Sequence, residues 1–154
     1  MVSVTDKAPT KREAKAIGRI VLPDQAYKLL QENQVQTAKG NVLTVAQIAG
    51  IQAAKTTANL IPLCHPLLLG LIDVRLWLND EKQSVECEST VQTSGKTGVE
   101  MEALTATSVA LLTVYDMCKA ASKDMTIEGI RVVEKIGGKS GPWKSTTHFK
   151  QSDE

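Results

Sequence analysis

The fold of this chain depends on one stretch, Gly95-Lys-Thr-Gly-Val-Glu-Met-Glu-Ala-Leu-Thr-Ala-Thr-Ser-Val-Ala-Leu-Leu-Thr-Val-Tyr-Asp-Met-Cys-Lys-Ala120, which lacks proline and has glycine only at its start. We predict one long helix here. Its apolar residues point nearly all round the helix axis, so we expect burial on most faces. Glu100 and Glu102 lie near the first turn, and Asp116 and Lys119 near the last. Charges on a buried helix must be paired, solvated in a cleft or used in a site.

The composition describes an ordinary globular protein of 154 residues. This length suits one core and is too short for two ordinary domains, so we expect a single domain, 1–154. Eighteen Lys and Arg against seventeen Asp and Glu leave a net charge of +1. Such a balance provides no global field to attract nucleic acid or an anionic membrane. Five aromatic residues also leave little to stack on bases, so no nucleic-acid partner is expected.

The cysteine and hydropathy patterns indicate a compartment. Three cysteines without a Cys-x-x-Cys pair fit a reducing environment better than a disulfide framework. No apolar run approaches the roughly 20 residues that a membrane span needs, and no signal-peptide pattern is present at the start. We therefore expect a cytoplasmic protein with no membrane partner.

The other elements follow from alternation and capping signals. Pro23 suits a first helical position, Asn41 can cap a following helix, and two prolines in the segment 60–67 forbid regular structure there. The predicted order is an N-terminal arm 1–11, a strand 13–22, helices 23–32 and 42–55, the loop 60–67, strands 68–78 and 83–92 as a hairpin, the long helix, a strand 125–135 irregular at Gly129, and a mobile C-terminal tail 137–154. For helix 42–55 we predict an apolar face of Val42, Val45, Ile48, Ala49 and Ile51, with small residues such as Gly50 allowing another backbone to approach. This order predicts an antiparallel α+β fold, with helices packed on one face of a single sheet.

Two glycine-rich segments could turn backbone amides toward an anion. They are Gly95-Lys-Thr-Gly98, just before the long helix, and Gly137-Gly-Lys-Ser-Gly141 in the tail. Neither is a Walker A motif, because the first glycine of that motif would fall on Thr90 or Val133. Each is therefore either an ordinary turn or a local anion site to which Lys96 or Lys139 adds charge.

The candidate acid–base groups lie at the ends of the long helix. Asp116 and Lys119 are three residues apart and share a helix face, so they form either a structural ion pair or a proton donor and acceptor. Burial would raise the pKa of one and lower that of the other, while their attraction opposes both shifts. Glu100 and Glu102 are about 200° apart around a helix and cannot face one pocket. They serve either as favourable first-turn acids or as members of different sites.

Lys39 and His65 are less distinctive by themselves. Lys39 lies in a turn beside Gly40, where a solvated lysine is the ordinary interpretation. His65 lies in a rigid proline-flanked loop, which restricts its freedom and can hold its side chain in one direction. The chain's other histidine is His148, and no metal-ligand spacing is visible, so we predict no metal site.

Together these segments resemble the cyclic pyranopterin monophosphate synthase family of molybdenum-cofactor biosynthesis. The matching segments are Lys39-Gly40, Gln47-Ile-Ala-Gly-Ile-Gln-Ala-Ala-Lys55, Leu60-Ile-Pro-Leu-Cys-His-Pro66, Gly95-Lys-Thr-Gly-Val-Glu-Met-Glu-Ala-Leu-Thr105, Val114-Tyr-Asp-Met-Cys-Lys-Ala120 and Gly137-Gly-Lys-Ser-Gly141. The resemblance implies a ferredoxin-like subunit, a homohexamer built from dimers, and active sites between subunits. It also implies a lyase that converts a dihydroguanosine triphosphate, cyclised between ribose C3′ and base C8, to cyclic pyranopterin monophosphate and pyrophosphate. That chemistry requires no redox cofactor, although Mg²⁺ could accompany the triphosphate.

The same resemblance implies roles for individual residues. It makes Asp116, Lys119 and Lys39 catalytic, and it gives substrate contacts to Leu63, Cys64, His65, Met101, Glu102, Glu100, Arg12 and Lys139. Among these, Arg12 and Lys139 would hold the triphosphate. The chain departs from the family pattern at Ser3 and Asn59, where the family commonly has acids. The site residues on the long helix fall at its two ends, so we expect them to belong to different pockets that subunit assembly completes. The alternative function is a non-catalytic oligomeric module that binds nucleoside triphosphates.

Overall fold

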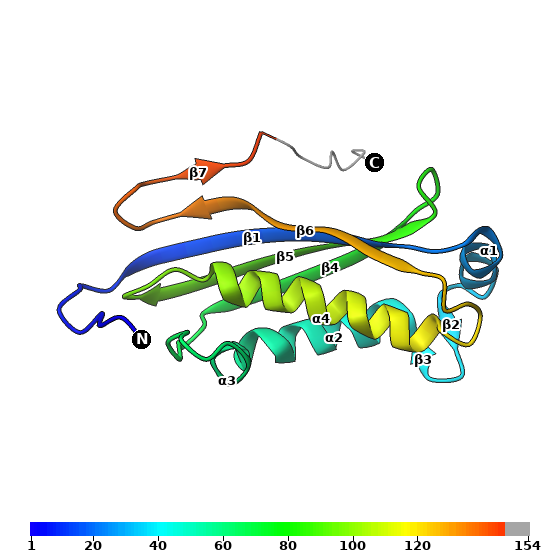
Figure 1. Cartoon of the computed structure of the whole chain (residues 1–154), viewed down its shortest axis with the longest axis horizontal. Helices are drawn as coiled ribbons and strands as arrows, with labels where there is room; N and C mark the ends of the chain where they lie inside the picture. Colours follow the sequence, from blue (N-terminus) through cyan, green and yellow to red (C-terminus); the bar gives the residue numbers. More distant parts are fainter. Residues whose placement is uncertain (147–154) are drawn as a thin grey trace.

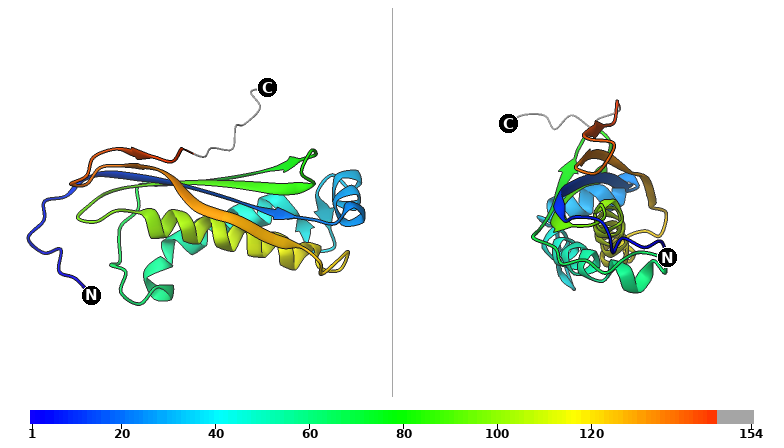
Figure 2. Two further views of the ribbon diagram at one scale, coloured as in Figure 1. Left: turned by 45° about the horizontal axis from the view of Figure 1, so that its top comes forward. Right: turned by 90° about the vertical axis from the view of Figure 1, so that its left-hand side faces the viewer.

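The structure is a computed structural model that describes residues 1–146. A twisted sheet forms one layer, and helices α2 and α4 cover one of its faces (Figures 1 and 2). The elements are β1 (Thr10–Val21), α1 (Asp24–Glu32), β2 (Gln36–Thr37), β3 (Gly40–Asn41), α2 (Val42–Lys55), α3 (Thr57–Leu60), β4 (Leu71–Asn79), β5 (Ser84–Gly95), α4 (Glu100–Cys118), β6 (Thr126–Ile136) and β7 (Trp143–Lys144).

The sheet has the ferredoxin-like connection pattern. Its strand order is β4-β5-β1-β6-β7, and every neighbouring pair is antiparallel. Along the chain, the four long strands and the two covering helices run β1, α2, β4, β5, α4, β6. The predicted α+β class with helices on one sheet face is confirmed. The irregularity predicted at Gly129 is also present, because Gly129 has φ +67° and the β1–β6 register shifts beside it.

The central strand β1 lets α4 approach the sheet closely. Ala14, Ala16 and Ile20 are fully buried. A Cβ on Gly18 would lie 3.0 Å from Leu111 Cδ1 and 3.2 Å from Thr107 Cγ2, both on α4. The strand also begins three residues before the predicted residue 13. Small residues on β1 therefore hold α4 against the middle of the sheet.

Helix α2 packs on α4 through its small residues. Asn41 caps it, with the Asn41 Oδ1 accepting a hydrogen bond from the Thr44 amide at 2.9 Å. A Cβ on Gly50 would lie 2.9 Å from the Ala106 carbonyl oxygen, so the two helix backbones approach closely as predicted. The predicted apolar face is wrong at Ile48 and Val45, which are 61% and 37% exposed, whereas Val42 is fully buried as predicted. The buried residues are Val42, Ala46, Gly50, Ala53 and Ala54.

Helix α4 is buried along a broad face and not all round. Its buried residues are Glu102, Ala103, Thr105, Ala106, Thr107, Ala110, Leu111, Val114, Met117 and Cys118. Leu112 is 56% exposed, so the burial that we expected on most faces of this helix is incomplete. Within residues 1–146, no helix has both the length and the apolar character needed to cross a membrane.

The glycine-rich turn after β6 lies against the end of the sheet where β1 begins. Residues 137–141 form a turn with positive φ at Gly137, Gly138 and Gly141, after which β7 pairs with β6. A side chain on Gly137 would collide with the Lys11 carbonyl oxygen, so the turn rests on the start of β1. The predicted tail mobility stays a prediction, and residues 147–154, which include His148, lie outside the described part of the chain.

Candidate active site

Three charged side chains meet at the carboxyl end of α4. Lys39 lies at the tip of the β2–β3 hairpin, where its amide donates to Thr37 Oγ1 at 3.2 Å. Its Nζ lies 2.7 Å from Asp116 Oδ2, and Lys119 Nζ lies 2.9 Å from Asp116 Oδ1. The side chains of Lys39, Asp116 and Lys119 are 54%, 52% and 50% exposed. One carboxylate therefore bridges two ammonium groups in an open position.

The electrostatics of this cluster differ from our expectation. Hydrogen bonds from Lys39 and then Lys119 lower the pKa of Asp116 to about 2, and the Asp116 carboxylate raises the pKa of Lys119. We expected a buried pair with competing desolvation, which is wrong because the groups are half exposed and their attraction dominates. The resting state is a carboxylate beside a protonated Lys119. This lysine can donate a proton or stabilise negative charge before it can accept a proton.

An apolar hollow lies beside this cluster. Its volume is about 270 Å³, and its walls come mainly from α1, the β2–β3 hairpin and the end of α4. The lining residues include Ala26, Leu29, Leu30, Met117 and Cys118. A hollow with apolar walls and charges at its rim can hold the face of a flat ring while polar groups reach its edge.

The amino end of α4 carries two acids in different environments. Glu100 Oε1 lies 2.6 Å from Lys135 Nζ on β6. Glu102 is only 3% exposed, and its Oε2 has no hydrogen-bond partner among the described residues. Burial, with a smaller contribution from the Glu100 charge, raises the pKa of Glu102. The two side chains have separate surroundings, in agreement with their spacing on a helix, and the unpaired acid is typical of a functional position.

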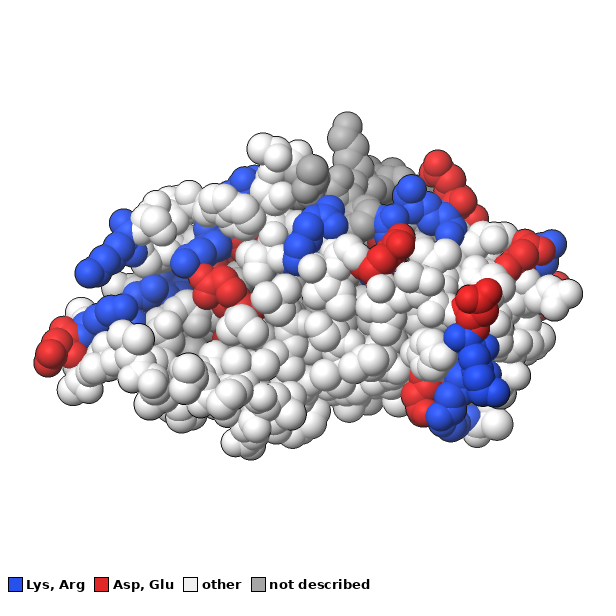
Figure 3. Space-filling view, viewed as in Figure 1, with Lys and Arg blue, Asp and Glu red and all other residues white. Residues whose placement is uncertain are grey.

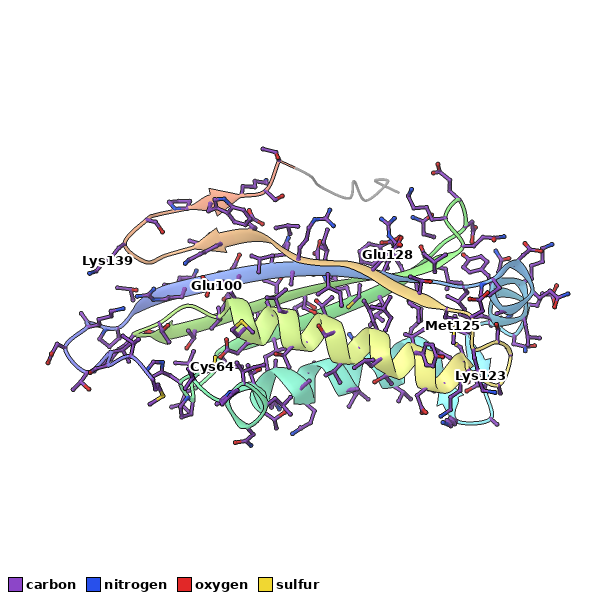
Figure 4. The ribbon with its side chains drawn as sticks, viewed as in Figure 1. Cys64, Glu100, Lys123, Met125, Glu128 and Lys139 are labelled. Atoms are coloured by element: carbon purple, nitrogen blue, oxygen red, sulfur yellow. The ribbon has the colours of Figure 1, made fainter. Side chains whose placement is uncertain are left out.

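The proline-flanked loop lies at the same end of α4. Figure 4 shows Cys64 near the start of α4 and Lys123 beyond the other end of that helix. Burial and the Glu102 charge raise the pKa of Cys64, so this thiol stays protonated. Leu63 is 70% exposed. His65 Nε2 lies 2.7 Å from the carbonyl oxygen of Val2.

Basic side chains gather around the Gly137–Gly138 turn. Arg12 donates from Nε to the Gly95 carbonyl at 3.3 Å, and a Cβ on Gly138 would lie 3.0 Å from Arg12 Nη1. Lys139 follows in this turn, at the same end of the molecule as Glu100 (Figure 4). In Figure 3, Lys and Arg lie at both ends of the molecule and along its upper side over β6, whereas the lower middle surface, over α2, carries no charge. Arg12 and Lys139 therefore lie at one end, although they are far apart in sequence.

The structure adds Lys135, which our sequence analysis missed. Its pairing with Glu100 and its position two residues before the glycine turn place it among the cations of this end. The only signal for Lys135 in the sequence was its position shortly before Gly137-Gly138, on a strand with alternating polarity. Among residues 1–146, no three His, Cys, Asp or Glu side chains are close enough to hold a metal ion.

The candidate residues therefore form two groups in one chain. Lys39, Asp116 and Lys119 lie at the carboxyl end of α4, while Glu102 and the residues described with it lie at the amino end. Asp116 comes 14 positions after Glu102, which corresponds to about 21 Å along the helix. Met101, half-buried next to Glu102, belongs to the amino-end group. The structure does not bring the two groups together within one chain.

The fold and these groups define a ferredoxin-like α+β protein with a lysine–aspartate–lysine cluster suited to proton transfer and charge stabilisation. The model of the MoaC family matches residues 1–138, and the chain belongs to this family. A protein of Heliobacterium modesticaldum is 55% identical, with 92% of this chain and 87% of that protein covered. One from Thermoanaerobacter pseudethanolicus is 50% identical, with 92% and 88% covered. Both relatives are named cyclic pyranopterin monophosphate synthase, so the resemblance found in the sequence is confirmed.

Proposed function

We propose that this chain is a cyclic pyranopterin monophosphate synthase. It would rearrange the cyclised dihydroguanosine triphosphate to the pyranopterin with a cyclic phosphate and release pyrophosphate. The proposal is supported by the family membership and by one structural observation, the contact of Asp116 with both Lys39 and Lys119 at 2.7 and 2.9 Å. A reaction with several proton transfers and a phosphoryl displacement needs such groups in one place.

The carboxyl-end cluster would carry the proton transfers. Lys119 rests protonated because Asp116 raises its pKa, so its first role is that of a general acid toward the base or the ribose. Lys39 would stabilise the negative charge that develops when a ribose hydroxyl attacks the α-phosphorus and pyrophosphate leaves. Asp116 holds both ammonium groups and reduces their mutual repulsion. Positioned acid–base groups of this kind typically contribute about 10² to 10⁴ in rate.

The amino-end group would hold the substrate. Arg12 can bind phosphate oxygens of the triphosphate with two parallel hydrogen bonds, and Lys139 can contribute a point charge. Lys135 would join them by exchanging its partner Glu100 for a phosphate oxygen, since both side chains of this pair remain about 30% exposed. The loop with Leu63, Cys64 and His65, together with Met101 and Glu102, would contact the rest of the substrate. No redox cofactor enters these steps, and Mg²⁺ would come only with the triphosphate.

We also propose that the active protein is a cytoplasmic homohexamer built from dimers, with each site shared between subunits. The separation of the two groups by about 21 Å along one helix supports shared sites. The exposure of Ile48 and Leu112 on the helical layer supports assembly, because each leaves a large apolar side chain in water.

Incubation with the cyclised substrate, followed by assay of pyrophosphate and of the pyranopterin product, tests this function. The parent protein should turn over, and Lys119→Ala should lose at least about 100-fold in kcat while keeping its unfolding midpoint. Lys123→Ala is the matched control, because this lysine is exposed in the next turn of the chain and should keep full activity. The alternative, a non-catalytic triphosphate-binding module, returns the substrate unchanged. An active Lys119→Ala protein would contradict the role of Lys119.

A further inference from the structure

The N-terminal arm, residues 1–9, folds back over the candidate site. Figures 1 and 2 agree that the N-terminus lies beside the loop between α3 and β4, the loop that carries His65. Two contacts anchor the arm. The Val2 carbonyl oxygen lies 2.7 Å from His65 Nε2, and Lys96 Nζ donates to the Thr5 carbonyl at 2.9 Å. The arm is therefore attached at two points while its Val2 side chain remains 80% exposed.

The contact with Val2 decides where His65 carries its proton. A backbone carbonyl can only accept a hydrogen bond, so Nε2 must be the donor in this contact. A neutral imidazole carries one N–H, which leaves Nδ1 without a proton and makes it the ring's acceptor. The partner of a ring nitrogen fixes the tautomer in the same way in other histidine sites. Because the partner here is backbone, the side chain at position 2 is not needed.

We infer that the N-terminal arm is a positioning element that fixes His65 in the Nε2–H tautomer, with Nδ1 held as an acceptor. This tautomer suits a ligand that offers a donor, such as a ring N–H or exocyclic amino group of a guanine-derived base. The opposite tautomer would present an N–H to an N–H and repel such a ligand. The assignment of the ligand rests on the proposed function, whereas the tautomer does not.

The tautomer can be measured without substrate. In ¹⁵N-histidine-labelled protein in alkaline buffer, long-range ¹H–¹⁵N spectra distinguish a protonated ring nitrogen from a bare one. The chain has two histidines, and His148→Gln identifies the signals of His65. The full chain should show His65 with a protonated Nε2 and a bare Nδ1. Deletion of residues 2–4, which removes the Val2 carbonyl, should move both nitrogens toward the average of the two tautomers.

A matched variant separates the carbonyl from the side chain. Val2→Ala keeps the carbonyl and should keep the signature of the full chain. A protonated Nδ1 in the full chain, averaged signals there, or unchanged signals after the deletion would each overturn the inference. The deletion removes residues outside the sheet, of which Val4 is partly buried, and an unchanged unfolding midpoint verifies that the fold is intact.

Turnover then tests the consequence for the ligand. If Nδ1 accepts a hydrogen bond from the substrate, the deletion should lower kcat/KM by about tenfold, mainly through KM. A changed tautomer with unchanged kcat/KM would overturn the role toward the substrate. Absence of turnover in the parent protein would refute the proposed function alone, because the spectra of the protein without substrate would still report the tautomer.

Discussion

Replacing Glu102 by glutamine tests whether the buried acid at the amino end of α4 is kept at a cost to stability. The side chain is 3% exposed, and its Oε2 lacks a hydrogen-bond partner among the described residues. A buried polar group without a partner costs about 1–3 kcal/mol, and a charged one costs more. Glutamine has nearly the same shape and never ionises. The substitution should therefore remove a destabilising charge without leaving a cavity.

The pH dependence gives this prediction its sign. Burial raises the pKa of Glu102 above its ordinary value of 4.5, so the folded protein binds more protons than the unfolded chain just above that pH. The free energy of unfolding of the parent must then fall as pH rises from about 4.5 through the folded pKa. Glu102→Gln lacks this fall in the free energy of unfolding, because glutamine does not ionise. The variant should match the parent at pH 4 and exceed it by about 1–3 kcal/mol at pH 8.

Urea unfolding at a series of pH values and one protein concentration measures this difference. Glu100→Gln is the matched control, because Glu100 pairs with Lys135 at 2.6 Å and both side chains are about 30% exposed. It should lose up to about 1 kcal/mol at neutral pH and gain none. Parallel pH curves for the parent and Glu102→Gln, or an equal response of both variants, would refute the reasoning. If Glu102 contacts substrate, its variant should combine higher stability with lower kcat/KM.

Two further predictions concern the carboxyl-end cluster and the assembly. In Asp116→Asn, Lys119 loses the carboxylate that raises its pKa, so the alkaline limb of the pH profile of pyrophosphate release should move to lower pH. An unmoved limb would show that another group titrates there. If sites are shared between subunits, Lys119→Ala and His65→Ala proteins that are unfolded and refolded together should form about one quarter of sites with both parental residues, and the mixture should be more active than either variant alone. No recovery would mean that one chain supplies both groups.

Local signals in the sequence predicted most of the fold. Alternation located the β4–β5 hairpin, and the Asn41 cap fixed the start of α2, because both signals depend on neighbouring residues. The buried face of α2 could not be found in this way. At a close helix crossing the smallest residues are buried, so Gly50 faces α4 while the larger Ile48 is exposed. Side-chain size at a helix crossing depends on the distance between backbones, which hydrophobicity does not encode.

Glu86 shows the same limit for the sheet. Alternation places it on the face away from the helices, yet it is only 2% exposed. Arg19 lies opposite it in the β1–β5 register and pairs with it at 3.2 Å, while Ser84 and Asn79 donate to its carboxylate at 2.8 and 3.2 Å. Such a buried ion pair can be predicted from the sequence only when it is known which strands are neighbours in the sheet.

In the candidate site too, the sequence predicted the local contacts and missed those between distant segments. The Asp116–Lys119 pair was readable because residues three apart share a helix face. Lys39 reaches the same carboxylate from 77 positions away, and Lys135 reaches Glu100 from another strand. Spacing cannot predict either contact, and the resemblance to a family identified only Lys39. Nothing in the sequence signalled that a backbone carbonyl of the arm would meet His65.

The packing of α4 limits how the two groups of residues can be adjusted to one another. Gly18 of β1 and Gly50 of α2 leave no room for a Cβ between their backbones and α4, so the helix is held from two sides. A helix held in this way keeps its ends about 28 Å apart over 19 residues. Movement within one chain is then left to the segments outside this packing, the arm, the His65 loop and the Lys39 hairpin. If each site is shared, the distance between the lysine–aspartate–lysine cluster and the amino-end group is set by the subunit contact, and a substitution at that contact should change kcat without touching a catalytic residue.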